Sequence, residues 1–376
     1  MTIARFIYDC SHKNADLYYA TRFLTPDSMV YFECGGKKYL VLDTLEVSRA
    51  KREAHVHKIF TVSDYKKDIE LRKGNPTDIV DVMGKIFSTF NIKTLEVPAN
   101  FPLFLADKFR ERKYKLIIGP SPFYPKRTQK TPLEKKAMIE AQKATFKLIA
   151  FVENLLRISK VKNGKLYFKG KALTSEFARE MTQIEALHLG YEMPESLIIA
   201  GGEHAIDPHD TGSGVLKPHE SIIVDIFPKS QTTFFCGDAT RTFCKGKAPL
   251  SLKKLYSTVK QAQELAIRSI HSKVNGRTIT ENTIRFFESN GYKTGKVDGR
   301  QQGFIHGVGH GIGLELHECP PYIISRDCIL ETGNVVSVEP GLYYKNIGGV
   351  RIEDLVYVTK TGCEVLANYP NRLEIL

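Results

Sequence analysis

Ser221-Ile-Ile-Val-Asp225-Ile-Phe227 is a strand-like segment in which a single carboxylate interrupts an apolar run. An ionised carboxylate is prohibitively costly to bury without a partner, so another group has to compensate the charge of Asp225. The chain then continues as Thr232-Thr-Phe-Phe-Cys-Gly-Asp238-Ala-Thr-Arg-Thr-Phe243, a second strand-like segment. A turn centred on residues 230–233 would place Asp225 opposite Asp238, with Cβ atoms about 5 Å apart. Two carboxylates at that distance repel each other unless a cation lies between them.

The same arrangement recurs nearer the C-terminus. Val335-Val-Ser-Val-Glu339-Pro and Gly349-Val-Arg-Ile-Glu353-Asp flank a turn at residues 346–349, and symmetry about residue 346 places Glu339 opposite Glu353. One such hairpin is equally compatible with a protonated carboxyl pair, an ion pair with a nearby arginine, or a metal. Two such hairpins in one chain favour a metal site.

Between the two hairpins, histidines are spaced by glycines in Phe304-Ile-His306-Gly-Val-Gly-His310-Gly-Ile-Gly-Leu-Glu-Leu-His317-Glu318. Glycine allows unusual dihedral angles and close backbone approach around these histidines. A lone histidine here would more often be a core residue, but three beside paired carboxylates indicate a site. Four carboxylates balance two divalent cations and a neutral imidazole completes the ligand shell. Oxygen-rich ligands without thiolate suit Mn, Co, Fe or Zn.

At 376 residues and 42% hydrophobic, the chain has the length of two globular domains of roughly 150 residues each. The seven cysteines are scattered and include no Cys-x-x-Cys pair, which argues against a disulfide framework or a thiolate zinc site. The sequence contains no apolar run of about 18 residues, so it predicts no membrane span. Met1–Ser11 lacks the apolar region of a secretion signal. We therefore expect a cytoplasmic protein with reduced cysteines.

Strand-like and helical patterns alternate over the first 125 residues, which indicates an α/β domain. The expected strands are 29–32, 38–42, 94–97 and 116–118, and the expected helices are 45–54, 78–90 and 103–112. The strand-breaking segment Gly119-Pro-Ser-Pro-Phe-Tyr-Pro125 is typical of a connector. We therefore place the domain boundary after it, which gives domains 1–125 and 126–376.

A capping box at Thr131-Pro132-Leu133-Glu134 predicts a long helix that ends near Ile158. Further helical patterns cover residues 175–189, 250–271 and 280–290, and strand-rich segments follow each helix pair. The order of two helices and then strands therefore occurs twice. This order indicates two similar halves that face each other, without a repeat in the sequence itself.

Positive charge is concentrated in residues 101–175, which hold 18 Lys and Arg against 5 Asp and Glu, while the whole chain carries +12. Such a stretch can contact nucleic acid or an acidic surface, or it can be a solvated helix face. A stacking platform and a recognisable nucleic-acid motif are lacking. We therefore expect a solvated surface and no nucleic-acid partner.

Five sequence elements, in this order, resemble those of the pita-bread metallopeptidases, a family that includes methionine aminopeptidase, aminopeptidase P, prolidase and creatinase. They are Asp225, Asp238 within Gly-Asp-Ala-Thr-Arg-Thr-Phe, His310 within Gly-His-Gly-Ile-Gly, Glu339-Pro-Gly and Arg-Ile-Glu353-Asp. The resemblance covers residues 126–370. It implies an α+β fold in which an N-terminal creatinase/prolidase-like α/β domain precedes a pita-bread catalytic domain, a duplicated ααββ unit.

The resemblance also implies a site for two divalent metal ions, with Mn expected before Co, Zn or Fe. Asp225 would chelate one ion, His310 and Glu339 would bind the other, and Asp238 and Glu353 would bridge both. Methionine aminopeptidases commonly lack a large N-terminal domain, and creatinase lacks the complete set of metal ligands. The implied branch is therefore aminopeptidase P and Xaa-Pro dipeptidase, which act on small proline-containing peptides, often as homodimers.

Catalytic roles follow from the same resemblance. His317 would stabilise the tetrahedral oxyanion, and His306 would contact the substrate carbonyl or the proline end. Glu339 would pass the proton of the attacking water to the leaving nitrogen. His209, in Asp207-Pro-His209, resembles the pocket histidine that precedes the first ligand strand, and its alternative interpretation is a surface turn residue.

The first hairpin departs from the family pattern. Asp225-Ile-Phe-Pro-Lys-Ser-Gln-Thr-Thr is a residue or two longer and replaces the usual Asp-x-Gly, which bears on pocket shape and specificity. One alternative function is therefore an aminopeptidase without proline specificity. Another is a non-enzymatic pita-bread protein that binds through the basic 101–175 stretch. Arg351 shares a strand face with Glu353, so we expect it to orient the carboxylate ligands.

Overall fold

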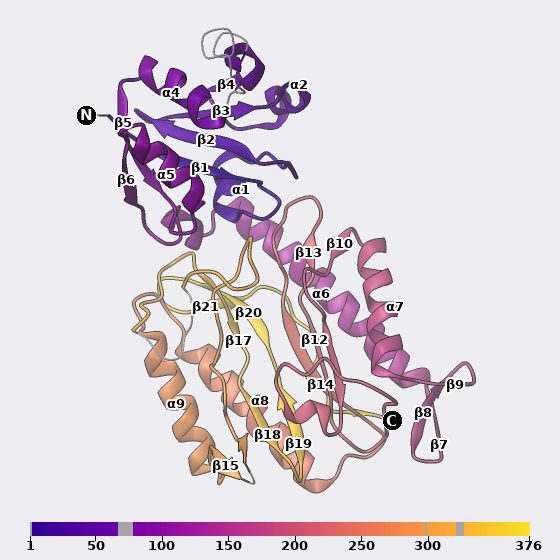
Figure 1. The fold of residues 1–376 in the computed structure, drawn as a ribbon. Coiled ribbons are helices and arrows are strands. Elements are labelled where there is room, and N and C mark those ends of the chain that lie inside the picture. Colours follow the sequence, from indigo (N-terminus) through magenta and orange to yellow (C-terminus); the bar gives the residue numbers. More distant parts are fainter. Residues whose placement is uncertain (1, 67–77, 298, 321–326) are drawn as a thin grey trace. The chain divides into compact units, whose positions relative to one another are not determined.

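The computed structural model describes residues 2–66, 78–297, 299–320 and 327–376 and divides into two compact units, Met1–Arg127 and Thr128–Leu376 (Figure 1). All seven cysteines are free. Across the described ranges, no helix is long and apolar enough to cross a membrane. The second unit contains every residue that the sequence assigns to the site.

The first unit is an α/β fold around a six-stranded mixed sheet in the order β4-β3-β2-β1-β5-β6. Its strands are β1 (Thr2–Asp9), β2 (Met29–Cys34), β3 (Lys37–Leu42), β4 (Lys58–Thr61), β5 (Ile92–Val97) and β6 (Lys115–Ile118). Its helices are α1 (Ala15–Thr21), α2 (Thr44–Glu53), α4 (Ile79–Thr89) and α5 (Leu103–Glu111). Phe6 of β1 packs against Phe87 and Phe109, with ring centroids 5.7 and 5.3 Å apart. An aromatic core therefore joins the sheet to α4 and α5.

All helices and strands expected in this unit are present, with ends that differ by at most two residues. Strands β1 and β4 and helix α1 were not predicted. The central strand β1 buries the consecutive residues Phe6 and Ile7 because both faces of the sheet are covered. Its pattern therefore lacks the alternation that identifies a half-exposed strand.

The second unit begins with helix α6 (Pro132–Ile158), which starts at the predicted capping box of Thr131 and Glu134. Helix α7 (Ser175–His188) follows, and both pack on a sheet of β11 (Ile198–Gly201), β12 (Ile222–Ile226), β14 (Ala239–Lys245) and β22 (Glu374–Ile375). The smaller strands of this half are β7 (Lys160–Lys162), β8 (Lys165–Phe168), β9 (Lys171–Ala172), β10 (Tyr191–Glu192) and β13 (Lys229–Ser230).

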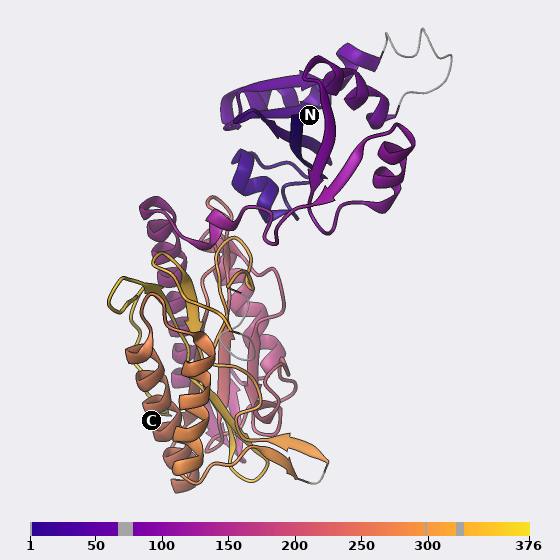
Figure 2. The same ribbon diagram turned by 90° about the vertical axis from the view of Figure 1, so that its left-hand side faces the viewer.

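The second half repeats this order with α8 (Leu250–Ser269) and α9 (Gly276–Ser289), and in Figure 1 this helix pair lies to the left in the second unit while α6 and α7 lie to the right. Its strands are β17 (Val335–Val338), β18 (Gly341–Tyr344), β19 (Gly348–Arg351), β20 (Asp354–Val358) and β21 (Cys363–Val365). β15 (Gly295–Val297) and β16 (Arg300–Gln302) form a projecting ribbon (Figure 2). Helix α9 begins four residues before the predicted Thr280, because the Asn275 side chain accepts a hydrogen bond from the Arg277 N–H and caps the helix there.

The first carboxylate hairpin does not have the expected register. Asp225 lies opposite Thr240 and not opposite Asp238. The turn is centred one residue later than expected, as the bridge between Lys229 and Cys236 shows. Because the resulting shift is two residues, each side chain keeps its face, and both carboxylates still point to the same side of the sheet.

The second hairpin has the predicted register. β17 pairs with β20 and β18 pairs with β19, both symmetrically about residue 346. Glu339 and Glu353 lie at the junction of these two strand pairs and are opposite each other in that register. Two separate hairpins thus bring four carboxylates toward one region of the second unit.

Candidate metal centre

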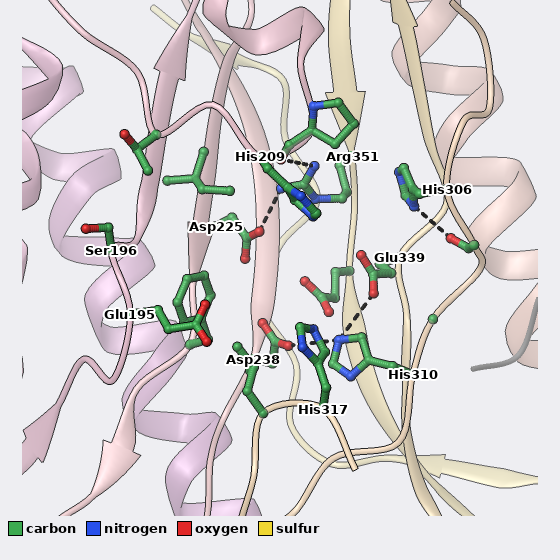
Figure 3. Close-up of a pocket in the computed structure, with 18 residues that line it drawn as sticks. Glu195, Ser196, His209, Asp225, Asp238, His306, His310, His317, Glu339 and Arg351 are labelled. Atoms are coloured by element: carbon green, nitrogen blue, oxygen red, sulfur yellow. Dashed lines mark hydrogen bonds and ion pairs between the residues drawn. The ribbon is translucent and has the colours of Figure 1, made fainter. Parts of the chain in front are cut away.

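A pocket of about 540 Å³ opens in the second unit, and all eight residues predicted for the site line it (Figure 3). They are His209, Asp225, Asp238, His306, His310, His317, Glu339 and Glu353. They come from the two carboxylate hairpins, the glycine-rich 304–318 run and the loop before β12. The fold therefore gathers segments that lie far apart in the sequence around one cavity.

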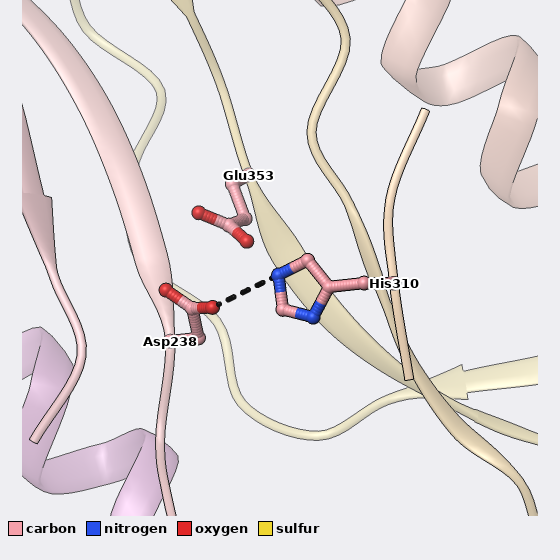
Figure 4. A group of neighbouring side chains, drawn as sticks. All are labelled: Asp238, His310 and Glu353. Atoms are coloured by element: carbon pink, nitrogen blue, oxygen red, sulfur yellow. Dashed lines mark ion pairs between the residues drawn. The ribbon is translucent and has the colours of Figure 1, made fainter. Parts of the chain in front are cut away.

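Asp238, His310 and Glu353 form the tightest group, with one potential ligand atom from each lying within 4.8 Å of the others (Figure 4). All three residues are buried. His310 Nε2 lies 3.4 Å from Asp238 Oδ2 and 3.3 Å from Glu339 Oε1. Four of the five predicted ligands are therefore close together, while Asp225 lines the same pocket outside this group.

Hydrogen bonds determine which nitrogen of His310 faces the carboxylates. Its Nδ1 lies 3.1 Å from the carbonyl oxygen of Gly311, which can only accept, so Nδ1 carries the proton. Nε2 then presents a lone pair toward the carboxylates, which is the form in which imidazole binds a metal. A Cβ on Gly309 would lie 2.0 Å from the carbonyl oxygen of Ser337, so this approach requires glycine.

The carboxyl groups of the cluster are buried at a cost that the protein alone does not offset. Burial, and then the charges of neighbouring carboxylates, raise the pKa of Asp238 and of Glu353 well above the usual range. Burial also raises the pKa of Glu339. In the part of the chain that the structure describes, Asp225 Oδ1 and Glu353 Oε1 are buried without a hydrogen-bond partner. Oxygen-rich donors, one imidazole nitrogen and two oxygens without a hydrogen-bond partner fit the binding of divalent metal ions.

Arg351 connects Asp225, which we call the outer predicted ligand, to the rest of the cluster. Its Nη2 donates to Asp225 Oδ2 at 2.6 Å, and its Nη1 donates to the Tyr343 hydroxyl at 2.8 Å. Its Nε donates to Thr240 Oγ1 at 3.2 Å, and that hydroxyl donates to Glu353 Oε2 at 2.8 Å. One guanidinium therefore orients one carboxylate directly and another through a threonine, as its strand face predicts.

Both ring nitrogens of His306 are engaged within the protein. Nδ1 donates to the Gly307 carbonyl oxygen at 2.8 Å, and Nε2 accepts from the Tyr343 hydroxyl at 2.9 Å. Burial lowers the pKa of His306 to about 3, so the ring is neutral at neutral pH. The imidazole therefore offers its face and carbon edge, rather than a free N–H, to a molecule in the pocket.

His317 stands against His310, with ring centroids 4.4 Å apart and ring planes at 84°. Burial, followed by the nearby His310, lowers the pKa of His317 to about 4, so this ring is also neutral at neutral pH. Among the described residues, neither the His317 ring nor the His209 ring has a hydrogen-bond partner. His209 is exposed and lines the pocket, so it combines the two interpretations given to it above.

Helix α6 holds the backbone of Asp238, a contact that the sequence did not predict. The fully buried Gln142 side chain donates to the Asp238 carbonyl oxygen at 2.8 Å and accepts from the Asp238 N–H at 2.9 Å. A Cβ on Gly237 would lie 2.6 Å from the Ala141 carbonyl oxygen, so helix and strand are in direct contact. A polar residue within the apolar buried stripe of α6 is the signal that marks Gln142.

A buried ion pair fixes the loop that carries His317. Lys130 and Glu318 pair through side chains that are 1% and 3% exposed. The Glu318 N–H also donates to the Gly311 carbonyl oxygen at 2.9 Å. A Cβ on Gly313 would approach the Lys130 Cε to 2.9 Å, so the loop is closely packed. Lys130 lies 188 residues from its partner in the sequence, and no local pattern indicates this contact.

The sequence model of metallopeptidase family M24 matches residues 136–360 of this chain. The chain belongs to metallopeptidase family M24. The match includes all eight predicted site residues.

M24 relatives with similar sequences are described as uncharacterized peptidases. One from Staphylococcus aureus (strain MRSA252) is 30% identical over 207 residues, which are 55% of this chain and 56% of the relative. YqhT of Bacillus subtilis (strain 168) is 33% identical over 180 residues, which are 48% of each protein. The chain therefore spans about half the length of these relatives.

Solved structures resemble this M24 chain over both of its units. The X-Pro aminopeptidase from Thermotoga maritima MSB8 has a TM-score of 0.83 at 23% identity, covering 100% of this chain and 98% of that one. The Xaa-Pro dipeptidase from Bacillus anthracis has a TM-score of 0.80 at 24% identity, covering 100% and 95%. These likenesses confirm the predicted fold, an N-terminal α/β domain followed by a pita-bread domain.

Proposed function

We propose that this M24 chain is a two-metal hydrolase that cleaves the peptide bond between the first residue of a small peptide and a following proline. The observation that carries the proposal is one pocket lined by the four carboxylates of the predicted ligands, His310 and two neutral histidines. Membership of family M24 supports peptidase chemistry. The fold shared with an X-Pro aminopeptidase and an Xaa-Pro dipeptidase supports the proline preference.

Asp225, Asp238, His310, Glu339 and Glu353 would hold the two divalent cations, with Mn²⁺ as our first candidate. When bound, such ions supply an activated water nucleophile and polarise the scissile carbonyl. The two buried oxygens without partners are the positions where the protein leaves coordination to an added ligand. The remaining chemistry belongs to the side chains around the cluster.

Glu339 is suited to move a proton. Burial raises the pKa of Glu339 above the ordinary carboxyl value, which favours a group that first accepts and then gives a proton. The Ser337 hydroxyl donates to Oε1 at 3.0 Å, so Oε2 remains for the transfer. We assign Glu339 the transfer of the proton of the attacking water to the leaving proline nitrogen.

The two neutral histidines have different parts in this proposal. His317 has no hydrogen-bond partner among the described residues, so its N–H can donate to the oxyanion that develops on the scissile carbonyl. His306 has both nitrogens engaged and offers a ring face. A bond to proline has no N–H to recognise, so apolar contact with such a face suits the pyrrolidine ring.

The proposal is tested by hydrolysis of matched peptides. The purified protein, loaded with Mn²⁺, is given Ala-Pro and Ala-Ala dipeptides and the tripeptides Ala-Pro-Gly and Ala-Ala-Gly. We expect cleavage after the first residue of the proline peptides and a much lower kcat/KM for the alanine peptides. Relative rates on the di- and tripeptides also distinguish a dipeptidase from an aminopeptidase.

Two other outcomes would replace the proposal. Faster cleavage of the alanine peptides would identify an aminopeptidase without proline specificity. A protein that binds two metals per chain and hydrolyses none of the four peptides would identify a binding protein. Metal content measured on the same sample separates this second outcome from simple loss of metal.

A further inference from the structure

We infer that the pocket selects a cationic first residue, lysine or arginine, through the carboxylate of Glu195. This inference rests on the proposed function, because it assigns a subsite within the same pocket. Four features of the structure support it: the position of a strand wall, the hairpin that carries this wall, the charges that line the pocket, and the side on which proline is expected.

One wall of the pocket, formed by Glu195, Ser196 and Ile198, lies beside β12, the strand that carries Asp225. β11 pairs antiparallel with β12, with Ile198 opposite Asp225, and the same register continued places Ser196 opposite Phe227. Side chains two residues apart share a face of a strand, so Phe227 points to the same side as Asp225. All four residues line the pocket together with Glu195. The pocket therefore extends past the metal ligands along this pair of strands.

The hairpin of β12 and β14 supports this wall through its turn. β10 pairs with β13, with Tyr191 opposite Ser230 and Glu192 opposite Lys229. The Gln231 N–H also donates to the Gly190 carbonyl oxygen at 3.0 Å. Residues 229–231 thus hold the chain segment that leads into β11. Glu195 lies in that segment, so the turn of the first hairpin helps to position this carboxylate.

Charge distinguishes Glu195 from the other acids of the pocket. Among the described residues that line the pocket, it is the one carboxylate outside the predicted metal ligands. Two divalent cations would balance the four ligand carboxylates, which leaves Arg351, beside Asp225, and Glu195 as the remaining charges of the lining. Within the described ranges, no side chain forms an ion pair or hydrogen bond with Glu195. With the ions bound, this end of the pocket keeps a negative charge that favours a cationic group.

The rest of the wall suits the stem of a long cationic side chain. Ile198, Phe227 and Leu316 line the same pocket and are apolar. Lysine and arginine cover such surface with their methylene groups while the charged end reaches a polar partner. Figure 3 shows Glu195 and His306 on opposite sides of the ligand cluster. A substrate whose proline lies against His306 would therefore extend its first side chain toward Glu195.

The test compares Lys-Pro with norleucine-Pro, which has nearly the same stem and no charge. kcat/KM is measured for both with the Mn²⁺-loaded wild type, Glu195→Gln and the control Glu192→Gln, whose exposed carboxylate does not line the pocket. We expect the wild type and the control to favour Lys-Pro by roughly fivefold, as for a partly exposed charge pair. The ratio should fall toward one in Glu195→Gln, and in the wild type at about 0.5 M salt.

Each other outcome is informative. Cleavage of norleucine-Pro by the wild type without a preference for Lys-Pro overturns the inference and leaves the proposed function in place. A preference that survives in Glu195→Gln also overturns it, because another group then supplies the charge. No cleavage of either dipeptide by protein with two bound metals overturns both the inference and the proposed function.

Discussion

Arg351 donates a 2.6 Å hydrogen bond from Nη2 to Oδ2 of Asp225, while Oδ1 of the same carboxylate has no partner among the described residues. The carboxylate is therefore anchored through one oxygen and open through the other. Such a charge-assisted bond fixes direction as well as position. The geometry of the outer ligand thus depends on a residue that need not touch a metal itself.

Replacement of Arg351 with Met should lower metal affinity about 10- to 100-fold, the usual effect of losing a group that orients a ligand. Calorimetric titration of the metal-free protein with Mn²⁺ measures this affinity. Arg300→Met is the matched control, since that side chain is 46% exposed and its Nη2 lies 4.0 Å from Asp207 Oδ2. Equal affinities for the two variants would show that Arg351 does not orient the site.

Asp238→Ala should remove both ions and the activity, because Asp238 lies in the centre of the buried cluster and its loss unbalances the remaining charges. Elemental analysis of the purified variant measures metal per chain. Glu288→Ala, on the exposed face of α9, should keep both ions. Retention of two ions and most of the rate in Asp238→Ala would remove the bridging role from this residue.

His317→Ala should keep its metal content and lose about 10²-fold in kcat, as when a donor to a developing oxyanion is removed. KM should change little. His188→Ala serves as control because that side chain is 71% exposed on α7. A His317→Ala protein with normal kcat, or one that has lost its metal, would contradict the assignment.

The stability gained from metal should depend on pH. Because the folded-state pKa values of Asp238, Glu339 and Glu353 are raised, these groups stabilise the metal-free fold below their unfolded pKa, and this contribution is lost as pH rises through the folded values. Metal replaces it at higher pH, with roughly 2.7 kcal/mol at a hundredfold excess over Kd. Thermal melts with Mn²⁺ and with EDTA should therefore differ more at about pH 7.5 than at about pH 5. Equal or opposite differences would show that the carboxylates are not compensated by metal.

The basic 101–175 stretch should remain a solvated surface. Lys136, Lys143 and Lys147 are exposed on α6, and Lys143 pairs with Glu140. Reversing these three lysines to Glu should leave peptide hydrolysis unchanged, and any RNA binding of the wild type should disappear by about 0.2 M salt. Lys135 is left unchanged because it pairs with Glu364 and lies 4.1 Å from the Tyr357 ring centroid. A salt-resistant complex that the triple variant loses would instead indicate a nucleic-acid surface.

Symmetry and local patterns account for what the sequence predicted well. The second hairpin has a compact turn, so counting from residue 346 gives the register that places Glu339 opposite Glu353. The first hairpin has a longer turn, and the same counting misses the register of Asp225 by two residues. Because the error is an even number of residues, Asp225 and Asp238 still point to the same side of the sheet. All eight predicted site residues therefore line one pocket despite this error.

Contacts made over long sequence distances account for what the sequence did not predict. Tyr343 and Lys130 have no local motif, Gln142 is marked only by its polarity within a buried stripe, and their partners lie on other elements. The central strand β1 was not predicted for a different reason: burial on both faces removes the alternation of apolar and polar residues that marks a strand. Residues that support a site are therefore harder to predict than the ligands, whose chemistry is visible in their type and spacing.

The two hydrogen bonds between Gln142 and the backbone of Asp238 attach a predicted metal ligand directly to helix α6. A variant library built to change metal preference would ordinarily vary the ligands and leave the scaffold alone. Here a one-residue change in the helix, such as Gln142→Leu, is expected to shift the position of Asp238 while leaving its carboxylate unchanged. We therefore expect the size preference for a bound metal ion to respond to a position that a search restricted to the ligands would miss.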